Sequence, residues 1–270
     1  YQDRLKQLIE SNEFKITPEN KKAEIVSFIR SGLEDFSISR SKERAKGVGV
    51  PVPNDEEQII YVWFDALAIY LTGIGFATDE KRFKQWWPAD LHIIGKDINR
   101  FHTVYWPAIL ISANLALPKQ VLIHSFIQSG GAKMSKTLGN VVDPFKMVNK
   151  YRLEPLRYYL LSQIPIDEDG DFTEERFKEV YNADLANGLG NTVSRLAKLA
   201  ETSGIELDNF EPPEEIYSKE YKQAIEDFEF NIVLHNTLVV ELQIIDQLIN
   251  QEEPWAIKDK YRLKTVLQEC

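Results

Sequence analysis

Two lysines in a glycine-flanked loop, Lys133 and Lys136, are the residues whose spacing most directly suggests chemistry. They stand in residues 130–140 (GGAKMSKTLGN), with two glycines before them and one after. Ammonium groups on such a loop can converge on one polyanion and neutralise charge that develops on a leaving pyrophosphate. A bare K-x-x-K pair is more often an ordinary solvated pair. This pair, however, follows an apolar run that we expect to be a buried strand of a parallel sheet, where ligands bind. The chain has no G-x-x-x-x-G-K-[ST] segment, which excludes a P-loop ATPase.

A second group of candidate site residues is aromatic. His102 and Trp106 are four residues apart and therefore share a helix face, just after a predicted strand at 91–94. With Trp63 and Phe101 they could line a small pocket. A thioether would pack on such ring edges at roughly 0.3–1.5 kcal/mol per contact. Aromatic residues that only fill a hydrophobic core produce the same pattern. Taken alone, these residues favour a core over a ligand pocket.

The segments that would position these residues are predicted to form an α/β domain. Residues 1–35 are predicted to form two short helices with a break near 12–18, where Thr17-Pro18-Glu19 is typical of a helix start. After them, apolar runs typical of buried strands alternate with helical segments, which indicates a parallel sheet. The predicted strands are 59–64, 91–94 and 121–127, and the predicted helices follow them to about 76 and over 101–115.

The remainder of the chain is predicted to be α-helical. Residues 156–270 are expected to be helical throughout, with a second long helix over about 217–250. Gly204 and the pair Pro212-Pro213 mark the break between the long helices. We place the domain boundary near residue 150, giving domains 1–150 and 151–270. The expected apolar stripe of the first helix consists of Leu185, Leu189, Val193, Leu196 and Leu199.

Residues 133–137 (KMSKT) resemble the KMSKS signature of class I aminoacyl-tRNA synthetases, with Thr in place of the final Ser. The resemblance implies activation of an amino acid by ATP, which enters with Mg²⁺ as substrate, followed by transfer to tRNA. It also implies that Lys133 and Lys136 bind ATP and, with Ser135, act in catalysis.

Three more segments are similar to methionyl-tRNA synthetases: 32–40 (GLEDFSISR), 61–70 (YVWFDALAIY) and 95–108 (GKDINRFHTVYWPA). The resemblance implies the second half of a Rossmann-type catalytic domain that activates L-methionine. Gly95 and Asp97 would bind ATP, facing its adenosine and the amino group of methionine. Leu67 stands where bacterial relatives commonly have proline, so the pocket rim is expected to differ. The implied methionine contacts are Arg40, Trp63, Ala66, Leu67, Tyr70, Phe101, His102 and Trp106.

The helical part also resembles the methionyl enzymes, in residues 181–195 and 251–255. The resemblance implies an α-helical-bundle domain that binds the anticodon of tRNA(Met) through Asn191, Arg195 and Trp255. Asn191 and Arg195 are four apart, so both can reach one nucleotide, and RNA loops are commonly read by stacking on aromatic rings. Taken alone, these residues fit a surface asparagine, a solvated arginine and a tryptophan that seals two helices.

Composition sets limits on the function. The net charge of −10, from 42 acidic and 32 basic residues, argues against a protein that coats nucleic acid non-specifically. One cysteine and four scattered histidines cannot form a structural zinc site, so we expect no metal site in this chain. No signal peptide is visible, and no apolar run approaches the length that spans a bilayer. We expect a cytoplasmic protein with no membrane partner.

Two functions of different class remain open at this point. The first is part of a synthetase that works only with its N-terminal half, because no HIGH-type motif for ATP occurs and Tyr1 already lies within helical spacing. Any zinc site of the family would also lie in that half. The alternative is a free-standing tRNA-binding or assembly module that has lost catalysis. A third possibility, another class I enzyme such as a leucyl-tRNA synthetase, shares the KMSKS loop but not the three methionyl-type segments.

Overall fold

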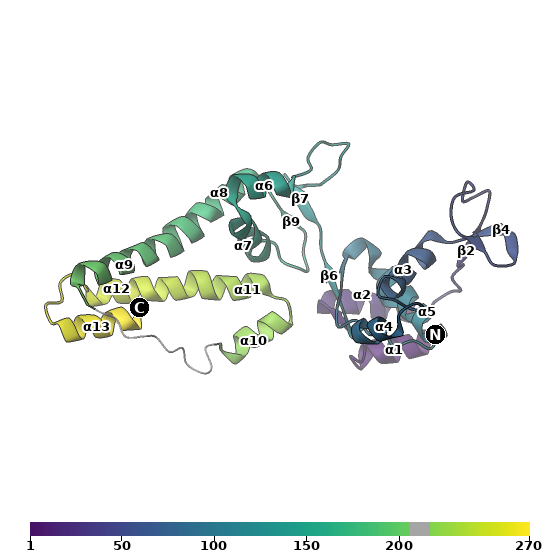
Figure 1. The fold of residues 1–270 in the computed structure, drawn as a ribbon, viewed down its shortest axis with the longest axis horizontal. Helices are drawn as coiled ribbons and strands as arrows, with labels where there is room; N and C mark the ends of the chain where they lie inside the picture. The colour runs from purple at the N-terminus through teal and green to yellow at the C-terminus, as the bar shows by residue number, and fades with distance from the viewer. Residues whose placement is uncertain (206–216) are drawn as a thin grey trace. The chain divides into compact units, whose positions relative to one another are not determined.

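The computed structural model describes residues 1–205 and 217–270, which form two compact units, residues 1–124 and 125–270 (Figure 1). The KMSKT segment belongs to the second unit, so the predicted boundary near residue 150 falls inside that unit. Pro212 and Pro213 lie outside the described residues.

The first unit is built on a three-stranded parallel sheet. Its strand order is β1 (Lys15–Thr17), β6 (Gln120–His124) and β5 (His92–Gly95), with both neighbouring pairs parallel. The parallel sheet and strand β5 were predicted, but β1 was not. A strand of three residues is too short for its alternation to be recognised, although Ile16 at its centre is only 2% exposed.

Helices α1 (Gln2–Glu10) and α2 (Glu19–Arg30) contribute to the core beside this sheet. In α1 the residues Leu5, Leu8 and Ile9 are buried, as their helical spacing predicts. The buried members of this core are Leu5, Leu8, Ile9, Phe14, Ile16, Ile25, Ile29, Ile94, Val104, Val121 and Ile123.

The predicted strand at 59–64 is wrong in both extent and pairing. Strand β4 (Asp55–Ile60) pairs antiparallel with β2 (Ser39–Ser41) and β3 (Pro51–Val52) in a separate small sheet. The chain then enters helix α3 (Val62–Thr72), as expected for the segment up to residue 76. The apolar run thus covers the end of a strand and the first turn of a helix. A short apolar run is compatible with either a strand or a helix, so its spacing alone does not distinguish them.

The predicted helix over 101–115 is present in two parts. Residues Phe101–Tyr105 form the π-helical segment η2, which continues into α5 (Trp106–Ser112). Before it come α4 (Glu80–Trp86) and the 3-10 turn η1 (Lys96–Ile98). Helix α4 begins where the carboxylate of Asp79 accepts a hydrogen bond from the Arg82 amide at 3.0 Å.

The second unit begins with a small sheet of β7 (Ile127–Ser129), β8 (Ala132–Lys133) and β9 (Gly170–Asp171). The predicted strand at 121–127 is therefore two strands. Between them the amide of Ser125 donates to the Ile166 carbonyl at 2.8 Å rather than to the parallel sheet. Strand β9 also corrects the expectation that residues 156–270 are helical throughout. Helices α6 (Pro144–Tyr151) and α7 (Leu153–Gln163) lie between β8 and β9.

Three consecutive helical segments then run without interruption (Figure 1): α8 (Glu174–Val180), the π-helical η3 (Tyr181–Gly190) and α9 (Asn191–Ser203). Gly204 ends the run in the left-handed conformation, as predicted. One member of the expected apolar stripe, Val193, is 55% exposed. The wider turns of η3 change the angular position of later residues, so a regular 3.6-residue spacing fails here.

The predicted helix over 217–250 is broken. Helix α10 (Lys219–Glu226) ends at Asp227, and Phe228 adopts a φ of 62° before α11 (Phe230–His235) begins. A phenylalanine rarely takes this conformation, so the sequence contained no recognisable break. Helix α11 continues through η4 (Asn236–Val240) into α12 (Glu241–Glu252), and α13 (Lys260–Glu269) is the last helix.

The run Phe230–Glu252 is long and apolar enough to span a membrane by length and composition. The sequence shows no uninterrupted apolar run here, because Asn231, His235 and Asn236 stand among the apolar residues. Its segments contact α7, η3 and α9 within the same unit, which is how a helix of a bundle packs.

We predict that Ile123→Ala lowers the unfolding free energy of the first unit by about 2–5 kcal/mol, because Ile123 is fully buried on the central strand β6. Ile93→Ala on the neighbouring strand is the matched control, since Ile93 is 64% exposed, and it should change stability by less than about 0.5 kcal/mol. Urea denaturation of both variants measures this. Equal losses would contradict the assigned burial.

Candidate functional site

An aromatic cluster of the first unit packs around strand β5 and the segment that follows it. Helix α3 supplies Trp63 and Tyr70, while η2 and α5 supply Phe101, His102 and Trp106. The rings of Trp63 and Phe101 are stacked at 4.3 Å between centroids, and both are half-buried. The cluster therefore joins a helix that precedes β5 to the segment that follows it.

A hydrogen bond of 2.9 Å joins the Tyr70 hydroxyl to Nε2 of His102. The other ring nitrogen, Nδ1, is 3.0 Å from the Ile98 carbonyl oxygen. Because a carbonyl only accepts, Nδ1 carries the proton, and Nε2 must accept from Tyr70. Burial lowers the pKa of His102, so the ring is neutral at pH 7.

His92 belongs to the same aromatic cluster, and the sequence interpretation did not name it. Its ring lies 4.4 Å from that of Tyr70, and burial together with the nearby His102 lowers its pKa to about 4. The signal was available, because His92 is the polar residue inside the apolar strand 91–94. Nδ1 of His92 and Nε1 of Trp106 are both buried without a hydrogen-bond partner in the described part of the chain.

The other predicted methionine contacts differ in their surroundings. Leu67 is 2% exposed and belongs to a core with Leu71, Trp87 and Trp106, whereas Ala66 is exposed. Arg40, on β2, donates from Nη1 to the carbonyls of Ser37 and Ser39 at 2.9 and 2.7 Å. Its guanidinium also lies 3.9 Å from the centroid of the Tyr61 ring. Arg40 is thus engaged by its own segment.

Gly95 and Asp97 stand at the end of strand β5, as predicted. A Cβ on Gly95 would lie 2.9 Å from Oδ1 of Asp97, so this exposed carboxylate approaches the strand end closely. This edge of the sheet is where parallel α/β folds bind ligands.

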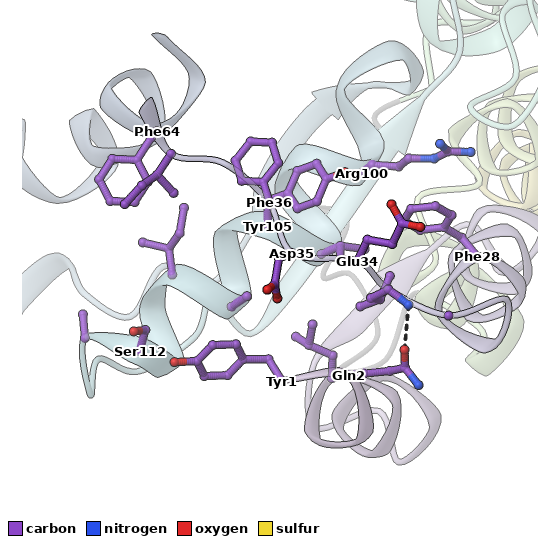
Figure 2. Close-up of a pocket in the computed structure, with 18 residues that line it drawn as sticks. Tyr1, Gln2, Phe28, Glu34, Asp35, Phe36, Phe64, Arg100, Tyr105 and Ser112 are labelled. Atoms are coloured by element: carbon purple, nitrogen blue, oxygen red, sulfur yellow. Dashed lines mark hydrogen bonds between the residues drawn. The ribbon is translucent and has the colours of Figure 1, made fainter. Parts of the chain in front are cut away.

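A hollow of about 1040 Å³ opens elsewhere in the first unit (Figure 2). Figure 2 shows Phe36 and Tyr105 side by side at its wall, and their rings are stacked at 4.3 Å. Asp35, Phe64 and Arg100 also line it. None of the predicted methionine contacts lines this hollow.

The KMSKT loop is a hairpin followed by a turn, both in the second unit. Lys133 ends strand β8, its Nζ lies 4.4 Å from the centroid of the Phe126 ring, and both Lys133 and Lys136 are exposed. Ser135 accepts hydrogen bonds at its Oγ from the amides of Thr137 and Leu138, at 3.1 and 3.3 Å. The hydroxyl of Ser135 therefore caps the turn.

The helical part brings the three predicted anticodon contacts together. Asn191 and Arg195 lie on α9, and the guanidinium of Arg195 is 5.1 Å from the centroid of the Trp255 ring. Nη2 of Arg195 also donates to Oδ1 of Asn250 at 3.1 Å. Trp255 is 55% exposed, so it does not seal two helices.

A polar hollow of about 460 Å³ adjoins these residues, lined by Asn187, Asn191, Thr192, Arg195 and Asp246. The sequence interpretation had not assigned Asn187 or Asp246. Asn187 was recognisable, because it stands one helical turn before Asn191, but Asp246 comes from another helix. An exposed ring beside amide, carboxylate and guanidinium groups suits a nucleobase, which stacks on its face and hydrogen-bonds through its edge.

Within the described residues, no group of three or more His, Cys, Asp or Glu side chains is arranged to hold a metal ion.

Comparison with known proteins agrees with these features. The family model for class I tRNA synthetases (M) matches residues 1–197. The Methionine--tRNA ligase of Brucella suis is 42% identical over 99% of this chain and 54% of its own length. That of Halalkalibacterium halodurans is 41% identical over 95% of this chain and 40% of its own. The chain thus spans about half the length of the curated relatives it matches.

Solved structures give the same result. The Mycobacterium tuberculosis methionyl-tRNA synthetase in complex with methionyl-adenylate superposes with a TM-score of 0.82 at 35% identity, covering 99% of this chain and 55% of that one. The free form of that enzyme gives 0.79 at 32% identity, with the same coverage. The Rossmann-type class I fold is therefore confirmed, and this chain belongs to the methionyl-tRNA synthetase family.

Proposed function

We propose that this chain is the part of a methionyl-tRNA synthetase that binds the methionine side chain, assists ATP cleavage and reads the anticodon of tRNA(Met). The reaction joins L-methionine to ATP as methionyl-adenylate and then transfers the methionyl group to tRNA. The observation that carries the proposal is the aromatic cluster around the Tyr70–His102 pair, in a chain of this family. The methionyl-adenylate described with the Mycobacterium tuberculosis relative supports the same chemistry.

The methionine site would consist of Trp63, Ala66, Tyr70, Phe101 and His102. The stacked pair Trp63–Phe101 offers ring edges to a thioether, a contact worth roughly 0.3–1.5 kcal/mol. The neutral His102 leaves no buried positive charge beside an apolar side chain. Leu67 and Trp106 are more deeply buried and would support the site from behind. Arg40 would approach the substrates only after leaving its carbonyl partners.

The KMSKT loop would act on the leaving pyrophosphate. Lys133 and Lys136 carry exposed ammonium groups that can neutralise the charge that grows on the β- and γ-phosphates as the bond to the α-phosphate breaks. Mg²⁺ would enter with ATP as part of the substrate. Gly95 and Asp97 would contact the nucleoside side. Ser135, whose Oγ accepts two backbone amides, would contribute by shaping the loop.

Two further parts complete the proposal. An N-terminal half, carrying the remaining elements of the ATP site, would be required for activity, which agrees with the half-length match to the relatives. We also propose a functional division near residue 150, with residues 151–270 as the anticodon-binding domain, where Asn191, Arg195 and Trp255 would bind the anticodon. Exposure of the Trp255 ring beside Arg195 supports this role.

We predict that Lys136→Ala in the complete synthetase lowers kcat for adenylate formation by about a hundred- to a thousandfold, the usual effect of losing a transition-state donor. The KM for methionine should change little. Lys146→Ala, an exposed lysine on α6, is the control. ATP–pyrophosphate exchange measures both constants, and a loss carried mainly by KM would make Lys136 a ground-state binder.

For the methionine site, Trp63→Ala should raise the KM for methionine on the order of tenfold, because ring contacts of roughly 0.3–1.5 kcal/mol each are lost. The KM for ATP should stay near normal. Trp86→Ala is the matched control, since Trp86 is 59% exposed in the same unit. Equal losses for both substrates would show that Trp63 only holds the fold.

For the anticodon, Trp255→Ala should weaken tRNA binding by roughly 1–3 kcal/mol, the usual contribution of a base stacked on an aromatic ring. Arg195→Ala should act in the same direction, and amino-acid activation should persist in both variants. Tyr261→Ala, at a residue 82% exposed on α13, is the control. Filter binding and thermal melting test this together. A variant that melts early yet binds tRNA normally would leave Trp255 with a structural role.

A further inference from the structure

The side-chain amide of Asn140, three residues after the KMSKT segment, bonds both to the turn that carries Lys136 and to the hairpin that carries Lys133. Its Oδ1 accepts a hydrogen bond from the Ser135 amide at 2.9 Å. Its Nδ2 is within 3.3 Å of the Lys133 carbonyl oxygen and 3.5 Å of those of Ser129 and Ala132. Asparagine can do this because it carries an acceptor and two donors on one planar group.

One of these parts is a closed turn over residues 135–139. The Gly139 amide donates to the Ser135 carbonyl at 3.1 Å, and Gly139 adopts a φ of 67°. With the cap at the hydroxyl of Ser135, this resembles a single helical turn with a start and an end. Lys136 stands on this turn.

The other part is the hairpin β7–β8, which carries Lys133 at its end. Gly130 and Gly131 both have positive φ values, 64° and 73°, which two-residue hairpin turns require. The Gly131 amide donates to Oδ1 of Asp171 at 3.0 Å, which ties the hairpin to the strand β9 segment. The hairpin is thus anchored to its unit independently of the turn.

The two lysines therefore stand on separate pieces of backbone, and Asn140 bonds to both pieces. We propose that Asn140 is a positioning residue that fixes the turn against the hairpin and so sets where the two ammonium groups stand. The proposal rests on the proposed function of the loop in neutralising pyrophosphate. A misplacement of about 1 Å in such a constellation lowers a rate by on the order of a hundredfold.

Two substitutions distinguish this role from simple space filling. Asn140→Ala removes every bond of the side chain. Asn140→Asp has the same size and keeps an acceptor for the Ser135 amide, but places a second oxygen against three carbonyl oxygens. If the two N–H donors of the Asn140 amide hold the loop together, the Asp variant must loosen the loop as much as the Ala variant does. The matched control is Leu138→Ala, which removes a side chain 68% exposed on the same loop and leaves its hydrogen bonds intact.

The first measurement is limited trypsin proteolysis of the purified chain, with cleavage after Lys133 and Lys136 followed by mass spectrometry. Both Asn140 variants should be cleaved at least on the order of fivefold faster than the unsubstituted chain, because the loss of even one hydrogen bond eases local opening by about that factor. Leu138→Ala should match the unsubstituted chain, and all thermal melting curves should coincide. Unchanged cleavage in Asn140→Ala, or protection restored in Asn140→Asp, would overturn the proposal.

The second measurement is ATP–pyrophosphate exchange by the complete synthetase carrying each variant. Asn140→Ala should lower kcat by on the order of tenfold to a hundredfold with little change in the KM for methionine. Faster cleavage of the Asn140 variants with unchanged kcat would refute the positioning role. A lower kcat in Lys136→Ala would still uphold the proposed function of the loop. If Lys136→Ala also left exchange unchanged, the proposed function of the loop would fall as well.

Discussion

The hydrogen bond between the Tyr70 hydroxyl and His102 Nε2 is the interaction on which the proposed methionine site depends. It is directional because the Ile98 carbonyl fixes the proton on the opposite ring nitrogen, so Tyr70 must donate. The bond connects helix α3 to the segment that follows strand β5, and these are the elements that supply the remaining rings. His92 packs against Tyr70, and burial keeps both histidines neutral at pH 7.

The three candidate sites differ in physical character, and each suits a different part of the proposed set of substrates. The aromatic cluster is largely buried and uncharged, which suits a thioether side chain. The KMSKT loop carries exposed ammonium groups on a backbone held by glycines, a serine cap and an asparagine, which suits a polyanion. The Arg195–Trp255 pair presents an exposed ring with polar groups beside it, which suits a nucleobase. Because the two compact units divide the chain at residue 124, the rings and the lysines belong to different units.

Much of the fold could be predicted from sequence because periodicity and glycine placement report local structure. Strand β5, helix α3 and the end of α9 at Gly204 follow from such patterns. Each feature of the fold that was not predicted has a particular cause. Strand β1 is only three residues long, the apolar run at 59–64 hides a change from strand to helix, and the break before α11 rests on a phenylalanine with positive φ.

The candidate site, like the fold, could be predicted only in part. The residues that the family resemblance named could be found from motifs, but their surroundings could not. That Leu67 is core, that Trp255 is exposed and that Arg40 bonds to its own segment depend on tertiary packing. His92 and Asn187 carried a local signal that was not used. Asp246 contributes from a separate helix, so no spacing in the sequence connects it to Asn191.

The central claim is that the cluster around Tyr70 and His102 selects methionine. The most direct test is ATP–pyrophosphate exchange by the complete synthetase with methionine, leucine, isoleucine and valine supplied separately. The account predicts a kcat/KM for methionine at least on the order of a hundredfold above that for each other amino acid, near the upper limit of what one pocket achieves between similar apolar side chains. A value for leucine, isoleucine or valine equal to that for methionine would contradict it.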